Sequence, residues 1–139
     1  MTSQPRLIAD LERSWPDVLR GLHMSFWRHE WNAHGRCCDS VFPQTQYFQW
    51  CHNRWGQKVI GNILAQSSII PGKNYSLSAI ENAIRANTAR TPYIRCVTSR
   101  KDRSVLLMEV VICYDYRGNN ILDCKPKSNC RATNISYPK

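Results

Sequence analysis

The chain has 139 residues, of which 42% are hydrophobic and 21% charged, and its formal net charge is +9. This length and composition fit one globular domain and exclude an intrinsically disordered chain. No apolar run reaches the roughly 18 residues that cross a bilayer, and we expect no membrane association by a spanning helix. The positive charge favours a polyanionic partner such as RNA, DNA, an anionic membrane surface or an acidic glycan, although a merely solubilising surface would carry the same charge.

The first half of the chain predicts helices. In residues 6–20 the leucines, Ile8 and the tryptophan recur near helical spacing, and Pro16 either ends that helix or opens a second one. Residues 25–34 predict a helix with an aromatic face, which Gly35 can end. Residues 44–66 predict a longer helix whose apolar side chains lie on or near one side, although two glycines weaken it.

The second half of the chain predicts strands as well as a short helix. A turn at residues 71–74 precedes a short helix, for which Ser78 and Glu81 are a possible capping box. Residues 105–116, rich in β-branched and aromatic side chains, predict a buried strand, and a Gly-containing turn joins it to a second strand at 121–124. Helices followed by a hairpin are typical of an α+β fold, in which we expect helices packed on an antiparallel sheet within a single domain.

The segment FWRHEWNAHGRCC, residues 26–38, concentrates groups that titrate or bind metals. On an α-helix, five positions separate His29 from His34 by roughly 140°, so the two imidazoles do not share one metal ion. Packing of the aromatic residues alone would make both histidines polar edges of a core. Acid/base chemistry on RNA is the other alternative, because two histidines near their usual pKa can act as base and acid without a metal.

Cysteines and sequons indicate an oxidising compartment. The chain has seven cysteines, none in a CxxC pair, which argues against a zinc knuckle. An odd number leaves one cysteine free or paired outside the chain. Two sequons, at Asn74 and Asn134, make these residues glycosylation candidates. The N-terminal residues 1–16 nevertheless contain no apolar segment of signal-peptide length.

The histidine segment resembles the second active-site motif of the ribonuclease T2 family, FWxHEWxKHGTC. Further segments resemble, in order, the C-terminal portion of plant members and of the self-incompatibility ribonucleases; they are ERSWPDVL, QYFQW, IIPGKNYSLSAIENAI, ICYD and ILDCKPKSNC. The resemblance covers nearly the whole chain, and the histidine motif is its most specific part.

The resemblance implies a role for each matching residue. His34 matches the second acid/base histidine, proposed as the general acid, His29 matches the histidine that holds the phosphate, and Glu30 matches the carboxylate that orients or stabilises that centre. Phe26 matches an aromatic side chain that contacts the base. Two further matches imply disulfides, Cys96–Cys130 and Cys113–Cys124, and Cys37 matches a cysteine whose partner lies upstream. Cys38 and Cys51 are left to pair with each other or to stay free.

The resemblance also implies substrate, partners and location. We expect cleavage of single-stranded RNA by transesterification through a 2′,3′-cyclic phosphate, by a secreted monomer that uses no metal and no cofactor. For a self-incompatibility type of protein, a recognition protein would be a further partner.

Two departures from the family pattern lower the expected activity. The lysine that precedes the second histidine in the family is Ala33 here, and the family's earlier motif HGLWP, which supplies the other catalytic histidine, does not occur in these residues. We therefore expect that the N-terminal part of the family domain is missing and that the chain alone cleaves RNA weakly or not at all. The alternative is a non-catalytic RNA-binding or partner-recognition module derived from that family.

Overall fold

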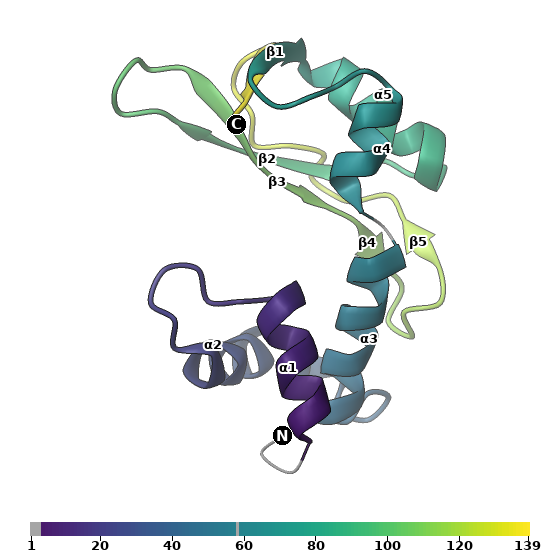
Figure 1. The fold of residues 1–139 in the computed structure, drawn as a ribbon. Coiled ribbons are helices and arrows are strands. Elements are labelled where there is room, and N and C mark those ends of the chain that lie inside the picture. The colour runs from purple at the N-terminus through teal and green to yellow at the C-terminus, as the bar shows by residue number, and fades with distance from the viewer. Residues whose placement is uncertain (1–3, 58) are drawn as a thin grey trace. The chain divides into compact units, whose positions relative to one another are not determined.

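A computed structural model describes residues 4–57 and 59–139. The backbone forms two compact units, Met1–Lys58 and Val59–Lys139, and each is described by itself. Figure 1 labels their helices and strands. Within the described ranges, no helix combines the length and the apolar character that a membrane span requires.

The first unit is helical. It contains α1 (Pro5–Ser14), α2 (His23–Glu30) and α3 (Gln44–Gln57), with a π-helical turn (Trp31–Gly35) and a 3₁₀ turn (Arg36–Cys38) after α2. Apolar side chains three and four positions apart share a helix face, which brings one buried group together from all three helices. Its members are Leu7, Leu11, Trp27, Trp31 and Phe48.

The predicted helix over residues 6–20 is too long, because α1 ends at Ser14. Pro16 disfavours a helical conformation for the residue before it, and Trp15 has left the helical region at φ −147° and ψ 58°. Residues 17–22 then form a loop around Asp17. Its carboxylate accepts hydrogen bonds from the backbone N–H groups of Leu19, Arg20 and Leu22 at 3.1, 3.1 and 3.2 Å.

The second unit packs helices on a sheet. Its helices are α4 (Ile60–Gln66) and α5 (Leu77–Thr88), and its strands are β1 (Lys73–Ser76), β2 (Tyr93–Thr98), β3 (Val105–Val111), β4 (Cys113–Tyr114), β5 (Ile121–Leu122) and β6 (Asn134–Tyr137). Four strands form one sheet in the order β1-β6-β3-β2, and β4 and β5 form a separate hairpin. The predicted α+β class is confirmed. The sheet is mixed rather than antiparallel, since β3 pairs with β6 in parallel.

The core of the second unit lies between α4, α5 and one face of the four-stranded sheet (Figure 1). Side chains along β2 alternate between the two faces of the sheet. Ile94 is buried and Cys96 packs against the core, whereas Arg95 and Val97 are exposed. The other buried side chains are Ile63, Leu64, Ile69, Ile80, Ala83, Ile84, Leu107 and Ile135.

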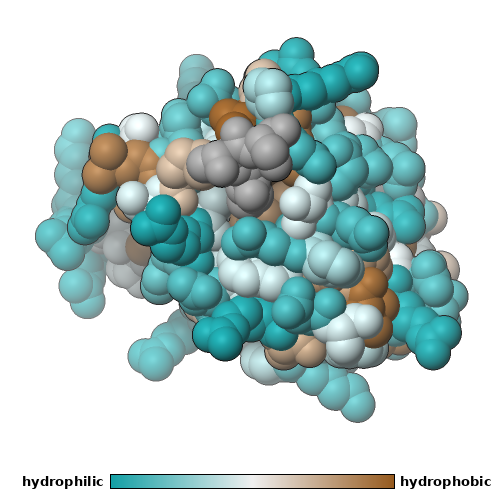
Figure 2. Space-filling view, turned by 90° about the horizontal axis from the view of Figure 1, so that it is seen from below, coloured by the Kyte–Doolittle hydropathy of each residue, from teal (hydrophilic) through white to brown (hydrophobic). Residues whose placement is uncertain are grey.

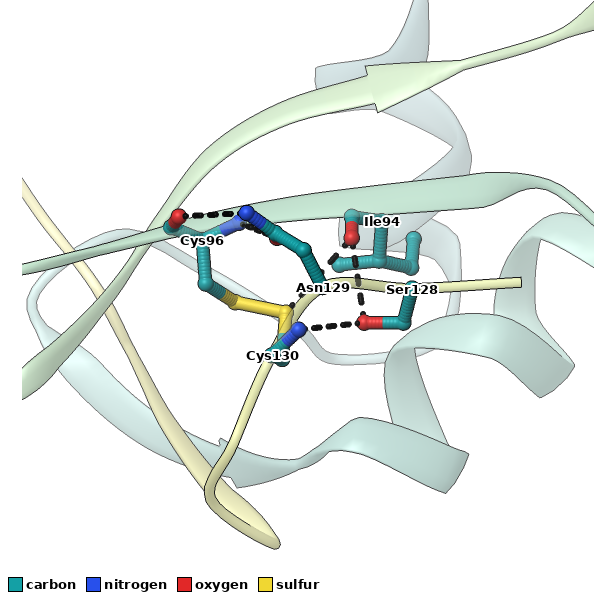
Figure 3. Close-up of a disulfide and its surroundings, with 5 residues drawn as sticks. All are labelled: Ile94, Cys96, Ser128, Asn129 and Cys130. Atoms are coloured by element: carbon teal, nitrogen blue, oxygen red, sulfur yellow. Dashed lines mark hydrogen bonds between the residues drawn. A yellow bond between two sulfur atoms is a disulfide. The ribbon is translucent and has the colours of Figure 1, made fainter. Parts of the chain in front are cut away.

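A disulfide and an asparagine attach residues 127–130 to β2 (Figure 3). Cys96 is bonded to Cys130, and the side chain of Asn129 bridges the backbone of Cys96. Asn129 Oδ1 accepts from the Cys96 N–H at 2.7 Å, and Asn129 Nδ2 donates to the Cys96 carbonyl at 3.2 Å. These bonds cover a strand edge that would otherwise be open.

Three further predictions differ from the structure. The predicted helix over 44–66 is two helices, because α3 ends at Gln57 and Val59 is extended; Lys58 lies outside the described residues. Gly56 near the break lowers helix propensity there. Ser76, and not Ser78, caps α5 by accepting a hydrogen bond from the backbone N–H of Ala79 at 3.1 Å.

The predicted strand over 105–116 is divided between β3 and β4 and is only partly buried. In β3 only Leu107 is buried, and Met108 on the other face is 53% exposed. The predicted hairpin is confirmed, since Cys113 lies opposite Leu122 and Tyr114 opposite Ile121.

Candidate functional site

The residues that the sequence singles out lie on consecutive turns of one helical segment. Phe26, His29 and Glu30 belong to α2, and His34 lies in the π-helical turn that follows. Both imidazoles are exposed, whereas Phe26 and Glu30 are partly buried. The histidines are therefore accessible to a ligand rather than enclosed in the aromatic core formed by Trp27 and its neighbours.

The π-helical turn is what exposes His34. In an uninterrupted α-helix, His34 would follow Trp27 by seven positions, or roughly 700°, and would therefore face the buried core as Trp27 does. In the structure the Arg36 N–H donates to the Trp31 carbonyl, a bond across five residues that widens the turn. Because the wider turn advances each residue by less than an α-helix does, His34 is exposed instead of following Trp27 into the core, and the 140° expected from an uninterrupted α-helix does not apply to the two histidines.

Gly35 allows this turn to close over Trp31. A Cβ at Gly35 would lie 2.9 Å from Trp31 Cζ3 and 3.2 Å from Cδ2, and closer still to Cε3. The backbone torsions of Gly35, φ −93° and ψ −34°, are open to any residue. Close approach to the indole, and not a left-handed conformation, is therefore the reason for glycine beside His34.

Replacing Gly35 by alanine is expected to lower the free energy of unfolding by about 1–3 kcal/mol, because the added methyl group overpacks against a buried ring. The exposed Gly61, around which a Cβ would meet nothing within 4 Å, provides the control in α4. Urea unfolding of G35A and G61A measures both effects. Equal stability of G35A and the wild type would show that Trp31 moves aside without cost.

A hollow of ≈ 540 Å³ opens beside His29. Side chains of α2 and of the loop at residues 17–22 form it together, and its lining consists of Asp17, Leu19, Arg20, Leu22, Ser25, Phe26 and His29. It combines an aromatic ring and exposed leucines with a guanidinium group and an imidazole. Such a mixture suits a flat, partly apolar ring that carries an anionic group.

Asp17 holds the loop side of this hollow. Partial desolvation opposes its ionisation, but hydrogen bonds from Arg20, Leu19 and Leu22 outweigh that effect and lower the pKa of Asp17 below its usual value. The Asp17 N–H also donates to His23 Nδ1 at 3.0 Å, which ties the loop to the start of α2. Sequence reasoning missed this loop, although an aspartate directly after proline is a common turn signal.

The cations nearest to the motif in sequence are exposed. Arg28 lies in α2 and Arg36 begins the 3₁₀ turn, and Ala33, the position of the family lysine, is also exposed. Among the described residues, no group of three histidine, cysteine or acidic side chains is arranged to hold a metal ion.

Three cysteines near this segment take part in neither of the two disulfides. They are Cys37, Cys38 and Cys51. Cys37 Sγ donates to the His34 carbonyl at 3.4 Å and lies 3.9 Å from Cys38 Sγ. Burial raises the pKa of Cys51 to about 11, which keeps its thiol protonated at neutral pH. The structure thus joins Cys38 to neither Cys37 nor Cys51.

The structure forms both disulfides that the resemblance implies, Cys96–Cys130 and Cys113–Cys124. The two sequon asparagines lie on β1 and β6, and both are exposed.

Figure 2 shows that hydrophilic side chains dominate one face of the molecule, with small apolar groups between them.

Comparison with known proteins extends the likeness over both units. The ribonuclease T2 family profile matches residues 1–124. The chain is 33% identical over 137 residues to ribonuclease 1 of Arabidopsis thaliana, covering 95% of this chain and 59% of that protein. It is 32% identical over 136 residues to ribonuclease MC of Momordica charantia, covering 97% of this chain and 71% of that protein.

Solved structures agree with this likeness. A ribonuclease MC1 variant in complex with 5′-GMP superposes with a TM-score of 0.91 at 31% identity, covering 98% of this chain and 71% of that chain. The Japanese pear S3-RNase superposes with a TM-score of 0.81 at 30% identity, covering 94% and 70%. The chain spans only 59% of the length of the Arabidopsis protein. Sequence and fold together show that the chain belongs to the ribonuclease T2 family.

Proposed function

We propose that this chain acts as a T2-type endoribonuclease on single-stranded RNA, with residues 1–139 forming one T2-like domain or its C-terminal portion. The observation that carries the proposal is the exposure of His29 and His34 on adjoining turns, together with a hollow that His29 and Phe26 line. Family members bound to 5′-GMP and 5′-AMP support a nucleotide ligand. The net charge of +9 supports a polyanion.

The proposed reaction is transesterification. A base removes the proton of the 2′-hydroxyl, the 2′ oxygen attacks phosphorus, and the 5′ oxygen leaves with a proton from an acid, giving a 2′,3′-cyclic phosphate that water then hydrolyses slowly. We assign the proton donor role to His34, contact with the phosphate to His29, and orientation of that centre to Glu30. Phe26 would contact the base by stacking.

The hollow between α2 and the loop at residues 17–22 gives the base a place. Phe26 and the leucines offer apolar surface to the ring, and Arg20 and His29 offer positive or polar groups to the adjoining phosphate. The carboxylate of Asp17 already accepts three backbone hydrogen bonds, so its role is to hold the loop in position.

We infer low activity for the 139 residues by themselves. Ala33 offers no cation to the transition state, and the other catalytic histidine, which the family draws from HGLWP, is not among these residues. Loss of one member of a catalytic unit costs orders of magnitude in rate. Secretion is part of the proposal, supported by the two disulfides and by the relative named extracellular ribonuclease LE from Solanum lycopersicum.

A non-catalytic RNA-binding module is the second candidate. The exposed Ala33 favours it, because a binding surface tolerates the loss of one transition-state cation better than a catalytic site does. Binding that weakens steeply with salt, without cleavage, would distinguish this function from the first.

The test measures cleavage and binding of one labelled single-stranded RNA by the purified chain and by H34A. We expect slow cleavage with 2′,3′-cyclic phosphate ends and a lower rate in H34A. The loss should be smaller than the usual effect of removing an acid/base group, about 100-fold or more, because members of one catalytic unit are not additive. H52A is the control, because His52 lies on α3 with its Nδ1 3.0 Å from Ser14 Oγ, outside the proposed site.

Each result separates the candidates. Cleavage that depends on His34 but not on His52 supports the nuclease, and salt-dependent binding without cleavage supports the binding module. Rapid cleavage that H34A leaves unchanged would contradict the assignment of His34 and the inference of low activity. Absence of both binding and cleavage would contradict both candidates.

A further inference from the structure

Both sequons of the chain lie in one strand pair, directly opposite each other. Asn74-Tyr75-Ser76 forms most of β1 and Asn134-Ile135-Ser136 forms most of β6, and the antiparallel register places Asn74 opposite Ser136 and Ser76 opposite Asn134. Nothing in the sequence pattern alone predicts that two sequons separated so widely along the chain meet in one ladder.

The period of two puts all four polar sequon residues on one face. The middle residues point to the other face, where Ile135 is fully buried and Tyr75 packs against the core. Tyr75 is fixed further by its hydroxyl, which accepts from the Ile70 N–H at 2.9 Å. A sugar attached to either asparagine would therefore project from the open face without displacing a core side chain.

The two asparagines differ in their surroundings. β1 is an edge strand that pairs with β6 alone, whereas β6 lies between β1 and β3. The chain reaches Asn134 four residues after Cys130, whose disulfide holds it to β2. An acceptor sequon must be accessible to the transferring enzyme. In the folded unit the β6 sequon has β1 on one side and β3 beside Ser136 on the other, whereas the β1 sequon has a neighbouring strand on one side only.

Crowding adds to this difference. Asn74 and Asn134 occupy diagonal positions on the same face of the ladder, where side-chain origins are about 7–8 Å apart or less. A branched oligosaccharide on one asparagine would overlie the other and its hydroxyl residue, which leaves room for a single glycan on this face.

We propose that Asn74 is an N-glycosylation site and that Asn134 stays unmodified. The glycan comes from a lipid-linked oligosaccharide pyrophosphate. Asn74 Nδ2 forms a bond to the anomeric carbon and loses a proton, while the bond from that carbon to the pyrophosphate oxygen breaks and the lipid pyrophosphate leaves. The proposal concerns the second unit alone and stands whether or not the chain cleaves RNA.

The test is secretion of the 139-residue chain, behind an added signal peptide, from a eukaryotic host. Peptide-N-glycosidase converts a glycosylated asparagine to aspartate, and peptide mass spectrometry then locates the converted residue. We expect conversion at Asn74 only in the wild type, unchanged occupancy in N134Q, and complete loss of the glycan in N74Q. Substitution of Ser76 is less suitable, because its hydroxyl caps α5.

The outcomes decide the proposal directly. A wild-type chain that is secreted without any glycan, or that carries its glycan on Asn134, overturns it. A glycan on both asparagines also overturns it, because the strand pair would then accommodate what the crowding argument excludes. A secretion level of N74Q equal to that of N134Q shows that the variants are folded and comparable.

Discussion

Replacing Trp27 by alanine is expected to lower the free energy of unfolding of the first unit by about 3–5 kcal/mol. Trp27 is 1% exposed and belongs to the buried group that joins the three helices. Its Nε1 donates to the Trp15 carbonyl at 2.8 Å, so the substitution leaves both a cavity and an unpaired carbonyl. The total stability of a small domain is often no larger than this loss.

Hydrogen exchange resolved by residue, together with urea unfolding, measures the loss in the first unit. M24A is the matched control on the same helix, since Met24 is 37% exposed and outside the buried group. W27F should fall between the two, because it keeps an aromatic ring but loses the N–H donor. Protection of α1 and α3 that is the same in W27A and M24A would contradict the role given to Trp27.

Trp27 anchors the helix that carries the candidate site. His29 lies two positions beyond Trp27 in α2 and points to the opposite, solvent side. The aromatic packing and acid/base hypotheses for residues 26–38 therefore do not exclude each other: the tryptophans supply the packing that holds the exposed histidines in place.

The sequence predicts much of this helix but not its most important irregularity. Aromatic spacing in residues 25–34 identifies the helix and its buried face. No periodic pattern in the sequence predicts the π-helical turn. Only the glycine at position 35 indicates that the backbone there lies close to another group, which is the ring of Trp31. An angle of roughly 140° between the two histidines holds only for five α-helical positions, and the π-helical turn interrupts them.

Strands were harder to predict than helices because they are short and irregular. β1 has the sequence KNYS, of which only Tyr75 is even partly buried, so it carries little hydrophobic alternation. In β2 the register shifts between Arg95 and Cys96, which breaks the period of two on which sequence reasoning depends. The hairpin at residues 113–122 was predictable because a Gly-containing turn separates its strands.

The residues of the candidate site also differ in how readily the sequence predicts them. Side chains whose chemistry is local, such as His29, Glu30 and His34, are recognisable from the motif alone. The loop at residues 17–22 is not, because its apolar side chains are exposed: Leu19 is 90% exposed and Leu22 59%. These leucines line the hollow because the hydrogen bonds of Asp17 hold the loop in place, and the spacing of residues in the sequence does not reveal those bonds.

Removal of the Cys96–Cys130 disulfide in C96S/C130S is expected to destabilise the second unit by about 4 kcal/mol. The bond joins residues 34 positions apart and therefore restricts the unfolded chain more than Cys113–Cys124, which spans 11 positions. The same chain-entropy relation gives about 3 kcal/mol for the shorter loop. The two double variants are thus matched in chemistry and differ in loop length.

The larger loss has a structural reason as well. Without the bond, only hydrogen bonds hold residues 127–130 along β2. They are those between the Asn129 side chain and the Cys96 backbone, and those that residues 127–129 form with the Ile94 backbone (Figure 3). Guanidinium unfolding under non-reducing conditions, monitored by hydrogen exchange in β2 and β6, compares C96S/C130S with C113S/C124S. If C113S/C124S is the less stable of the two, loop length does not control stability here, and strand β2 is held by its side-chain hydrogen bonds rather than by the disulfide.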